Sequence, residues 1–307
     1  MADTLTAGYT LTAKKEDVLD ALYRVAIEET PVLNMIGKGV AKNTLHSWFT
    51  EDIDAAVNTN AHEDGADLDS AAANTPAKKN NNTQILKHSF KLSRTANEVA
   101  QYGIQNEINR HRAIKSIQIL KDLEMTMLHN QAAVTAASGT AGKLGGLPAW
   151  VTSNVSRGTS GANGGNGSTA ATDGTQRAIT LDMVKSVTQS MFNNGAQVSG
   201  NYLIAGAFNK GKISAFTGST TRYEDVTGKK LTLSVDTIDT DFGGLNVLPV
   251  HHIRARDAFI INPKFLRMAY LTQPKFEELA QTGDARKFHV VAEATLEVLN
   301  EKALGVI

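Results

Sequence analysis

Cysteine is absent from this 307-residue chain. Its absence excludes disulfides, thiolate zinc sites and cysteine nucleophiles, and it fits a reducing compartment. Charge of one sign is not in excess either, because 31 basic side chains balance 31 acidic ones. Binding DNA by neutralising many phosphates needs a basic surplus, so that class is disfavoured. No apolar run approaches the ~20 residues of a membrane span, and the N-terminus lacks a signal-peptide core. We expect a protein made in the cytoplasm, with no membrane partner.

Aromatic residues are also scarce, at 6% of the chain. Few bulky side chains for this length make a thin core, and the area buried per residue limits the stability of a single fold. We therefore expect contacts between subunits to supply part of the stability.

Two stretches have helical periodicity. Residues 14–29 carry apolar side chains at spacings of three and four, and Thr30-Pro31 ends this helix because the residue before a proline avoids the helical region. Residues 104–136 form the longer one, about 50 Å at ~1.5 Å per residue. A compact chain of this length is itself about 50 Å across. We therefore predict an elongated body with a helical spine.

Strand-like stretches at 44–53 and 84–93 flank some thirty residues that cannot form a core. In the second stretch Leu86, Phe90 and Leu92 alternate with polar residues. A structureless loop of this length is unusual inside a compact domain. We therefore predict a two-stranded arm that reaches away from the body.

The middle of the chain has a different composition. Residues 156–175 are a Gly, Ser, Thr and Asn loop with almost nothing to bury. A helix is predicted next, capped by Thr180 or Asp182 and stopped by Gly195, and strands and a short helix follow it to residue 253. The tail returns to strands, and in its long alternating run five side chains share one face: Val290, Ala292, Ala294, Leu296 and Val298.

The segment Gly206–Ile213, GAFNKGKI, follows a predicted strand and nearly matches the phosphate-binding pattern G-x-x-x-x-G-K-[ST]. The residue after the lysine should carry the hydroxyl that binds magnesium. Ile213 stands there instead, and Ser214 points about 100° away on a helix. We favour a turn at Gly206 into a short helix that docks through Ile213, and we keep a nucleotide-binding enzyme using residues 206–213 as a second hypothesis.

Other reactive side chains lack the spacing of a site. His62-Glu63-Asp64 are adjacent in a loop, and His251-His252 face opposite sides of a predicted strand. Asp236, Asp239 and Asp241 lack the EF-hand pattern, and no G-x-S-x-G elbow presents a serine. The basic pairs Lys78-Lys79 and Arg254 with Arg256 are either solvated or partners for the acidic stretch 51–69 of a neighbour. We expect no catalytic residue, metal or cofactor.

Five phrases, in order along the chain, carry a resemblance to a known family. They are TPVLNMIGK at 30–38, GLPAWVTSNVSRG at 146–158, IAGAFNKGKISAFTG at 204–218, YLTQPKFEELAQTGDARK at 270–287 and LNEKALGVI at 299–307. With the order of the elements, they make the chain similar to the major capsid proteins of tailed double-stranded-DNA phages, which have the Hong Kong 97-type fold. The resemblance covers nearly the whole chain.

The resemblance implies an α+β fold in five parts. These are an N-terminal arm at 1–43, an E-loop at 44–93, a peripheral domain with the spine helix at 94–140, an axial domain at 141–250 and return strands of the peripheral domain at 251–307. The E-loop would lie across the adjacent subunit, and the axial domain near the five-fold and six-fold centres of the shell. No internal scaffold segment is expected, since little chain precedes the first predicted helix.

The resemblance further implies a non-catalytic capsid protein of the virion. Its copies would form hexamers and pentamers around double-stranded DNA, which they hold non-specifically, with the portal and scaffold or decoration proteins as further partners. A two-stranded arm is marginal alone, so we expect Trp48, Phe49, Leu86, Phe90 and Leu92 to contact a neighbouring subunit. A tail or decoration component with β-rich arms is the remaining structural hypothesis.

Overall fold

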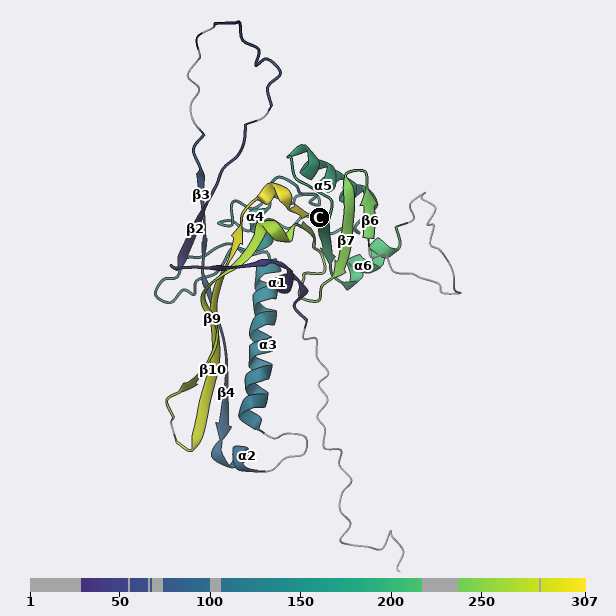
Figure 1. Cartoon of the computed structure of the whole chain (residues 1–307). Coiled ribbons are helices and arrows are strands. Elements are labelled where there is room, and N and C mark those ends of the chain that lie inside the picture. Colours follow the sequence, from purple (N-terminus) through teal and green to yellow (C-terminus); the bar gives the residue numbers. More distant parts are fainter. Residues whose placement is uncertain are drawn as a thin grey trace, which may run out of the picture.

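The computed structural model describes residues 29–54, 56–65, 67, 74–99, 106–216, 237–281 and 283–307. The helix predicted at 14–29 lies outside these ranges except for its last residue, and so do Asp236 and the strand start predicted at 231–236. Figure 1 shows an elongated body with a hairpin arm leaving one end and a long β-hairpin reaching the other.

The described helices begin where the sequence supplies a cap or a proline. Side chains of Ser93, Asn106 and Thr180 each accept a backbone N–H from the first turn, so Thr180 and not Asp182 is the cap of its helix. Gly195 follows that helix with φ of 78°, as a helix stop requires. The helices are α1 Pro31–Met35, α2 Arg94–Glu98, α3 Glu107–Leu128, α4 Leu147–Trp150, α5 Leu181–Asn193 and α6 Ala207–Ser214, with 3₁₀ turns at Pro263–Phe265 and Glu301–Ala303.

The strands within the described ranges form three sheets. A four-stranded sheet has the order β1-β9-β10-β4, a five-stranded sheet the order β11-β8-β5-β7-β6, and β2 pairs with β3 alone. The bounds are β1 Gly37–Val40, β2 Leu45–Thr50, β3 Ala77–Asn82, β4 Gln84–Ser93, β5 Asn201–Ala205, β6 Thr237–Thr240, β7 Gly243–Pro249, β8 Ala258–Ile261, β9 Leu266–Leu279, β10 Ala285–Val298 and β11 Gly305–Val306.

The spine helix α3 has 22 residues, so the predicted span of 104–136 was too long at its C-terminal end. Beyond Leu128 the side chain of Asn130 bonds both the N–H and the carbonyl of Ala171, which draws the chain out of the helix. Val134 then pairs with Lys143 in a small hairpin. Alanine-rich sequence favours a helix, but these tertiary bonds outweigh that preference. At ~1.5 Å per residue the spine is about 33 Å long.

The first core lies between α3 and the four-stranded sheet. Ile119, Leu123 and Met127 of α3 are at most 1% exposed and belong to one cluster with the buried side of β10. The five side chains predicted to share a face of that strand are all in this cluster: Val290, Ala292, Ala294, Leu296 and Val298. The alternating run therefore marked the core side of the sheet.

The second core belongs to the five-stranded sheet and α5, with Val184, Met191 and Ile213 at 0% exposure. Two strands from beyond residue 250, β8 and β11, pair within this sheet. The assignment of all of 251–307 to return strands of the other domain therefore needs correction. All four side chains of β8 are buried, which suits the interior of a covered sheet.

The arm also pairs differently from the prediction. β2 pairs with β3 and not with 84–93, which is β4 and lies antiparallel to β10 from Gln84 opposite Ala294 to Ser93 opposite Ala285. The alternating apolar side chains of β4 give it a face to bury against α3, whereas the polar β3 has none. The projecting hairpin therefore ends near Thr83, and 84–93 belongs to the body.

The glycine-rich loop 156–175 folds back on the body, although the sequence predicted little burial there. Gly165 pairs with Thr169, and the Gly167 N–H donates to the Ala149 carbonyl. Gly167 has φ of 76°, and a Cβ on it would collide with the Trp150 ring. Glycine is needed here for close approach of the backbone, and not only for freedom of the chain.

Candidate assembly surfaces

The arm projects apolar side chains away from its own body. β2 and β3 pair from Leu45 opposite Asn82 to Thr50 opposite Ala77, and Figure 1 shows the chain continuing outward from their ends. Phe49 is 68% exposed, Ile53 95% and Val57 65%. Nothing else in the described ranges covers these side chains, so they form an apolar surface suited to another molecule.

The root of the arm, by contrast, is held inside the chain. Trp48 is 7% exposed, its ring centre lies 5.3 Å from that of Trp150, and its indole N–H donates to the Val298 carbonyl at 2.9 Å. On the paired strand the Asn81 amide donates to the Leu296 carbonyl at 2.8 Å. Both strands are thus bonded to β10, and the body sets the direction of the arm.

Three of the predicted subunit contacts lie on the inner side of β4. The Phe90 ring is 5.1 Å from His111 of α3 and 5.1 Å from Phe288 of β10, and Leu86 packs against the first core. Leu92 is on the same side and is half-buried. With Trp48, four of the five residues therefore pack within the chain, while Phe49 is mostly exposed. Their contact with a neighbouring subunit stays a prediction.

Glu124 is a buried carboxylate that the sequence reasoning passed over. It is 0% exposed on α3, and its Oε2 accepts the Leu33 N–H of the short helix α1 at 3.0 Å. Burial raises the pKa of Glu124, although the N–H groups of Leu33 and Val32 act in the opposite direction. The signal was present in the sequence, because this acid stands beside Leu123 in the apolar pattern of the spine. Glu124 joins the start of the described chain to the spine.

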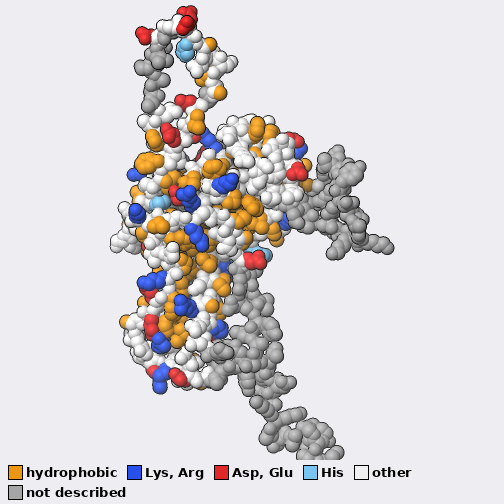
Figure 2. Space-filling view, in the orientation of Figure 1, with side chains coloured by type: hydrophobic (Ala, Val, Ile, Leu, Met, Phe, Trp, Pro, Cys, Tyr) orange, Lys and Arg blue, Asp and Glu red, His pale blue; other side chains and the backbone are white. Residues whose placement is uncertain are grey.

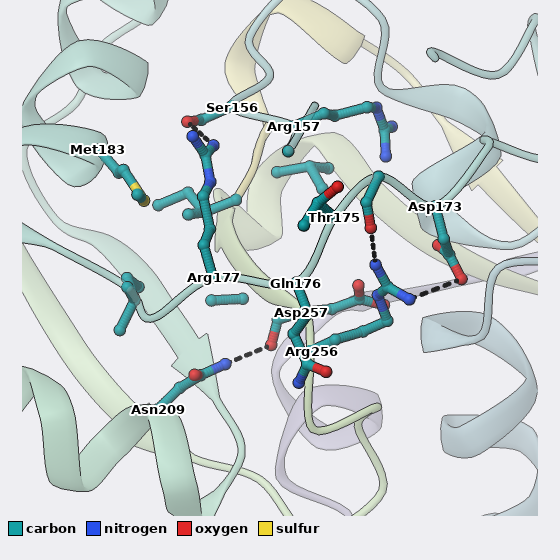
Figure 3. Close-up of a pocket in the computed structure, with 16 residues that line it drawn as sticks. Ser156, Arg157, Asp173, Thr175, Gln176, Arg177, Met183, Asn209, Arg256 and Asp257 are labelled. Atoms are coloured by element: carbon teal, nitrogen blue, oxygen red, sulfur yellow. Dashed lines mark hydrogen bonds and ion pairs between the residues drawn. The ribbon is translucent and has the colours of Figure 1, made fainter. Parts of the chain in front are cut away.

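A cluster of charged side chains joins the glycine-rich loop to the bend before β8. Figure 3 shows three of its members, Asp173, Arg256 and Asp257, among the residues that line a cavity of about 60 Å³. Arg254 donates to both oxygens of Asp173 at 2.9 and 3.0 Å and to Asp257 at 2.6 Å, and Arg256 donates to the Gly174 carbonyl. The predicted role of Arg254 and Arg256 as solvated groups or partners for a neighbour's acidic stretch is therefore wrong. Both bind carboxylates of their own chain.

The titration of this cluster follows from the same contacts. The Arg254 hydrogen bond holds the pKa of Asp173 below its ordinary value. Burial raises the pKa of Asp257 and outweighs the effect of the same arginine. Burial also lowers the pKa of the Arg157 guanidinium, which donates to Asn163 at 2.8 Å. The cluster is a cross-linked network that holds the loop in place.

The segment 206–213 is a turn at Gly206 followed by a short helix, as expected if it does not bind a nucleotide. Gly206 is the N-cap of α6, and Ile213 is 0% exposed in the second core. Asn209 is also buried, and its amide donates to the carbonyls of Ala255 and Asp257 at 3.2 Å. The position that should bind magnesium is thus occupied by a core side chain, and the nucleotide hypothesis gains no support.

The metal-type side chains do not come together. In the ranges that the structure describes, no three His, Cys, Asp or Glu side chains are placed to hold a metal ion. β7 ends at Pro249, so His251 and His252 lie in a bend and not on the predicted strand. Proline lacks the N–H that would extend the ladder. Burial lowers the pKa of His252. Among the described helices none is long and apolar enough to cross a membrane.

Solved structures share this architecture. A chain from Microbacterium phage Oxtober96 has a TM-score of 0.64 at 10% identity, covering 96% of this chain and 95% of that one. A chain of the cyanophage A-1(L) capsid asymmetric unit has a TM-score of 0.63 at 14% identity, covering 98% of both. A chain from Mycobacterium phage Adephagia has a TM-score of 0.61 at 11% identity, covering 100% of this chain and 98% of that one. The fold is thus the α+β, Hong Kong 97-like fold of phage capsid proteins, as predicted.

Sequence comparison identifies the family. Residues 4–307 match the family described as SU10 major capsid protein. A major capsid protein of Escherichia phage Phieco32 is 31% identical over 129 residues, which are 42% of this chain and 37% of that protein. The aligned part is thus well under half of that relative. The chain belongs to the SU10 major capsid protein family, which is a family of structural proteins of the virion capsid shell.

Proposed function

We propose that copies of this chain assemble, without catalysis, into hexamers and pentamers of an icosahedral shell around double-stranded phage DNA. The observation that carries the proposal is the arm, whose root is buried in its own body while Phe49, Ile53 and Val57 stay exposed. Heterologous contacts of this kind close into rings when the rotation permits. The DNA is held without sequence preference, and the portal and scaffold or decoration proteins complete the head.

The parts of the chain then take these roles. Residues 1–43 are the N-terminal arm, and 44–83 are the E-loop, shortened from 44–93 because β4 belongs to the body. The spine α3 and the four-stranded sheet form the peripheral domain. The five-stranded sheet, with β8 and β11 added to the predicted 141–250, forms the axial domain near the capsomer centres.

Electron microscopy of the protein, expressed with the assembly proteins of its own phage, tests the proposal. Wild type should yield shells with many copies per particle, and a protein that stays monomeric under all such conditions contradicts it. Phe49→Ser should lower the yield of shells by tenfold or more, because it removes an exposed ring from the arm. Phe49→Tyr keeps the ring and should assemble like wild type, and circular dichroism of both variants verifies that they are folded.

A further inference from the structure

Two arginines at the base of the glycine-rich loop lack an acidic partner. Arg157 is near the first end of the loop, and Arg177 follows its last end. Arg157 donates to the Asn163 side-chain carbonyl at 2.8 Å and to the Pro148 carbonyl at 3.3 Å. Arg177 donates to the Ser156 hydroxyl at 2.7 Å. These acceptors are neutral, and among the residues that the structure describes neither guanidinium forms an ion pair.

The acids nearby are already bound by another arginine. Arg254 donates to both oxygens of Asp173, at 2.9 and 3.0 Å, and to both oxygens of Asp257, at 2.6 and 3.0 Å. Arg256 adds a contact of 3.4 Å to Asp173. Even with the carboxyl group of Ile307 counted, four arginines stand against three acids. The region therefore keeps an excess of positive charge.

One cavity brings three of these arginines together. Arg157, Arg177 and Arg256 all line it (Figure 3). Gln176 lines it too, and its amide has no hydrogen-bond partner in the described part of the chain. Figure 2 shows Lys and Arg side chains scattered over the visible face of the body and not gathered into one broad basic surface. A site for an anion therefore has to come from a few side chains that a cavity collects.

The size of the cavity and its free donors suit a small oxyanion. About 60 Å³ holds about four to six waters at ~10–15 Å³ each, which is close to the five heavy atoms of a phosphate. Arg157 uses two of the five N–H donors of a guanidinium and Arg177 uses one, so both retain donors. Burial lowers the pKa of Arg157, so its charge is disfavoured there and a bound anion would offset that cost.

We propose that this cavity binds a phosphate group, held by the free N–H donors of Arg157 and Arg177. Guanidinium groups bind phosphate oxygens in pairs, which gives both affinity and orientation. The bound group would bridge the two ends of the glycine-rich loop and fasten its base. The site belongs to the single chain and does not depend on the proposed shell. The phosphate group can be the free ion or part of the DNA backbone, and the experiment separates these two sources.

Titration calorimetry of the purified full-length chain with inorganic phosphate, at constant ionic strength, provides the test. We expect saturable binding to wild type, and binding at least tenfold weaker to Arg157→Gln with Arg177→Gln. Arg177→Lys keeps the charge without the planar fork, so its affinity should lie between those of wild type and the double variant. Arg267→Gln removes an exposed arginine outside the cavity and should bind phosphate like wild type.

Limited proteolysis gives a second readout, because a ligand stabilises the state that binds it. Saturating phosphate should slow cleavage within residues 156–175 at least threefold in wild type and have no effect in the double variant. Arg177 is exposed, so Arg177→Gln alone should fold by circular dichroism and still bind more weakly than wild type. Short duplex DNA that displaces the phosphate would assign the site to the DNA backbone, and DNA that does not would assign it to the free ion.

Three results would overturn the proposal. The first is no saturable binding to wild type at about 10 mM phosphate. The second is equal affinity of wild type and the folded double variant, which would mean an adventitious ion only. The third is an equal loss of affinity in Arg267→Gln, which would mean that overall charge and not this cavity attracts the ion. Failure of wild type to form shells would contradict the proposed function and leave each of these measurements unaffected.

Discussion

At the scale of single residues, buried polar groups decide how the parts of this chain are joined. Glu124 holds the N–H of Leu33, and Asn81 and Trp48 bond carbonyls of β10. All three side chains are at most 7% exposed, and burial makes an unsatisfied polar group costly. Their substitution should therefore affect a connection and not only the local packing.

The carboxylate of Glu124 should respond to pH in a defined direction. Because its pKa is raised in the folded state, the charge is a cost to stability as pH rises above the ordinary value of 4.5 through the raised value. We expect Glu124→Gln to increase the free energy of unfolding at pH 7, since the amide still accepts the Leu33 N–H. That gain should shrink as the pH falls through the raised pKa towards 4.5, and below 4.5 it should be absent, because the carboxyl group is then protonated in both the folded and the unfolded state. Urea denaturation of dissociated subunits from pH 4 to 7 measures it.

The control for that experiment is Glu124→Ala. It leaves the Leu33 N–H buried without an acceptor, and such a loss costs about 1–3 kcal/mol. Its effect should persist across the whole pH range. If Gln and Ala behaved alike at pH 7, the hydrogen bond to α1 would not be the function of this side chain.

Gly211 in the interior of α6 should be replaceable. A Cβ added there meets no atom within 4 Å, and glycine weakens a helix interior relative to alanine. We expect Gly211→Ala to stabilise the chain by about 0.5–1 kcal/mol, measured by urea denaturation. Gly195→Ala is the matched control, because that position has equal space but φ of 78°, and it should destabilise. A loss of stability in Gly211→Ala would mean that this position has a role that its geometry does not show.

At the scale of elements, the arm and the glycine-rich loop share one feature. Each is a polar segment that a few buried contacts hold to the body. The arm is held at Trp48 and Asn81, and the loop at Asp173 and Ala171. Among the residues that the structure describes, neither segment has a core of its own. Each segment is ordered by its contacts with the body. Long projecting segments can therefore be held without additional buried hydrophobic area.

Trp48 is the contact whose removal should detach the root of the arm from the body. Trp48→Ala removes a buried ring and the bond to Val298, and we expect it to cost about 3–5 kcal/mol. The root of the arm should loosen, so limited proteolysis should cut faster within residues 51–76 than in wild type. Trp48→Phe keeps most of the packing, so its rate of proteolysis should lie between those of wild type and Trp48→Ala. Unchanged proteolysis in Trp48→Ala would show that β3 alone anchors the arm.

At the scale of the whole molecule, the residues that the structure describes form two cores and leave several surfaces open in the single copy. Few aromatic residues and two separate clusters leave a modest core for 307 residues. The stability that is lacking can come from neighbours, because binding stabilises the folded state by mass action. The exposed apolar side chains of the arm are the groups that would gain from such contacts.

Assembly should therefore change thermal stability. We expect shells to unfold in differential scanning calorimetry at a clearly higher temperature than dissociated subunits of the same protein. The difference in unfolding temperature between shells and subunits should be smaller for Phe49→Ser, because the contact of its arm with a neighbouring copy is weakened. Equal melting temperatures for shells and subunits would mean that the single chain already holds all of its stability.

The sequence by itself determined the stop at Gly195, the core side of β10 and the core role of Ile213, and it narrowed the cap of α5 to Thr180 or Asp182, because these depend on local periodicity and backbone preference. It also carried the family through phrases spread along the chain. The tertiary structure alone decided which strands pair. β4 lies on β10 and not on β2, β8 and β11 join the five-stranded sheet, and α3 stops at Leu128. Pairing and helix length depend on partners distant in sequence, such as Asn130 with Ala171, and local preference cannot anticipate bonds to residues that only folding brings near.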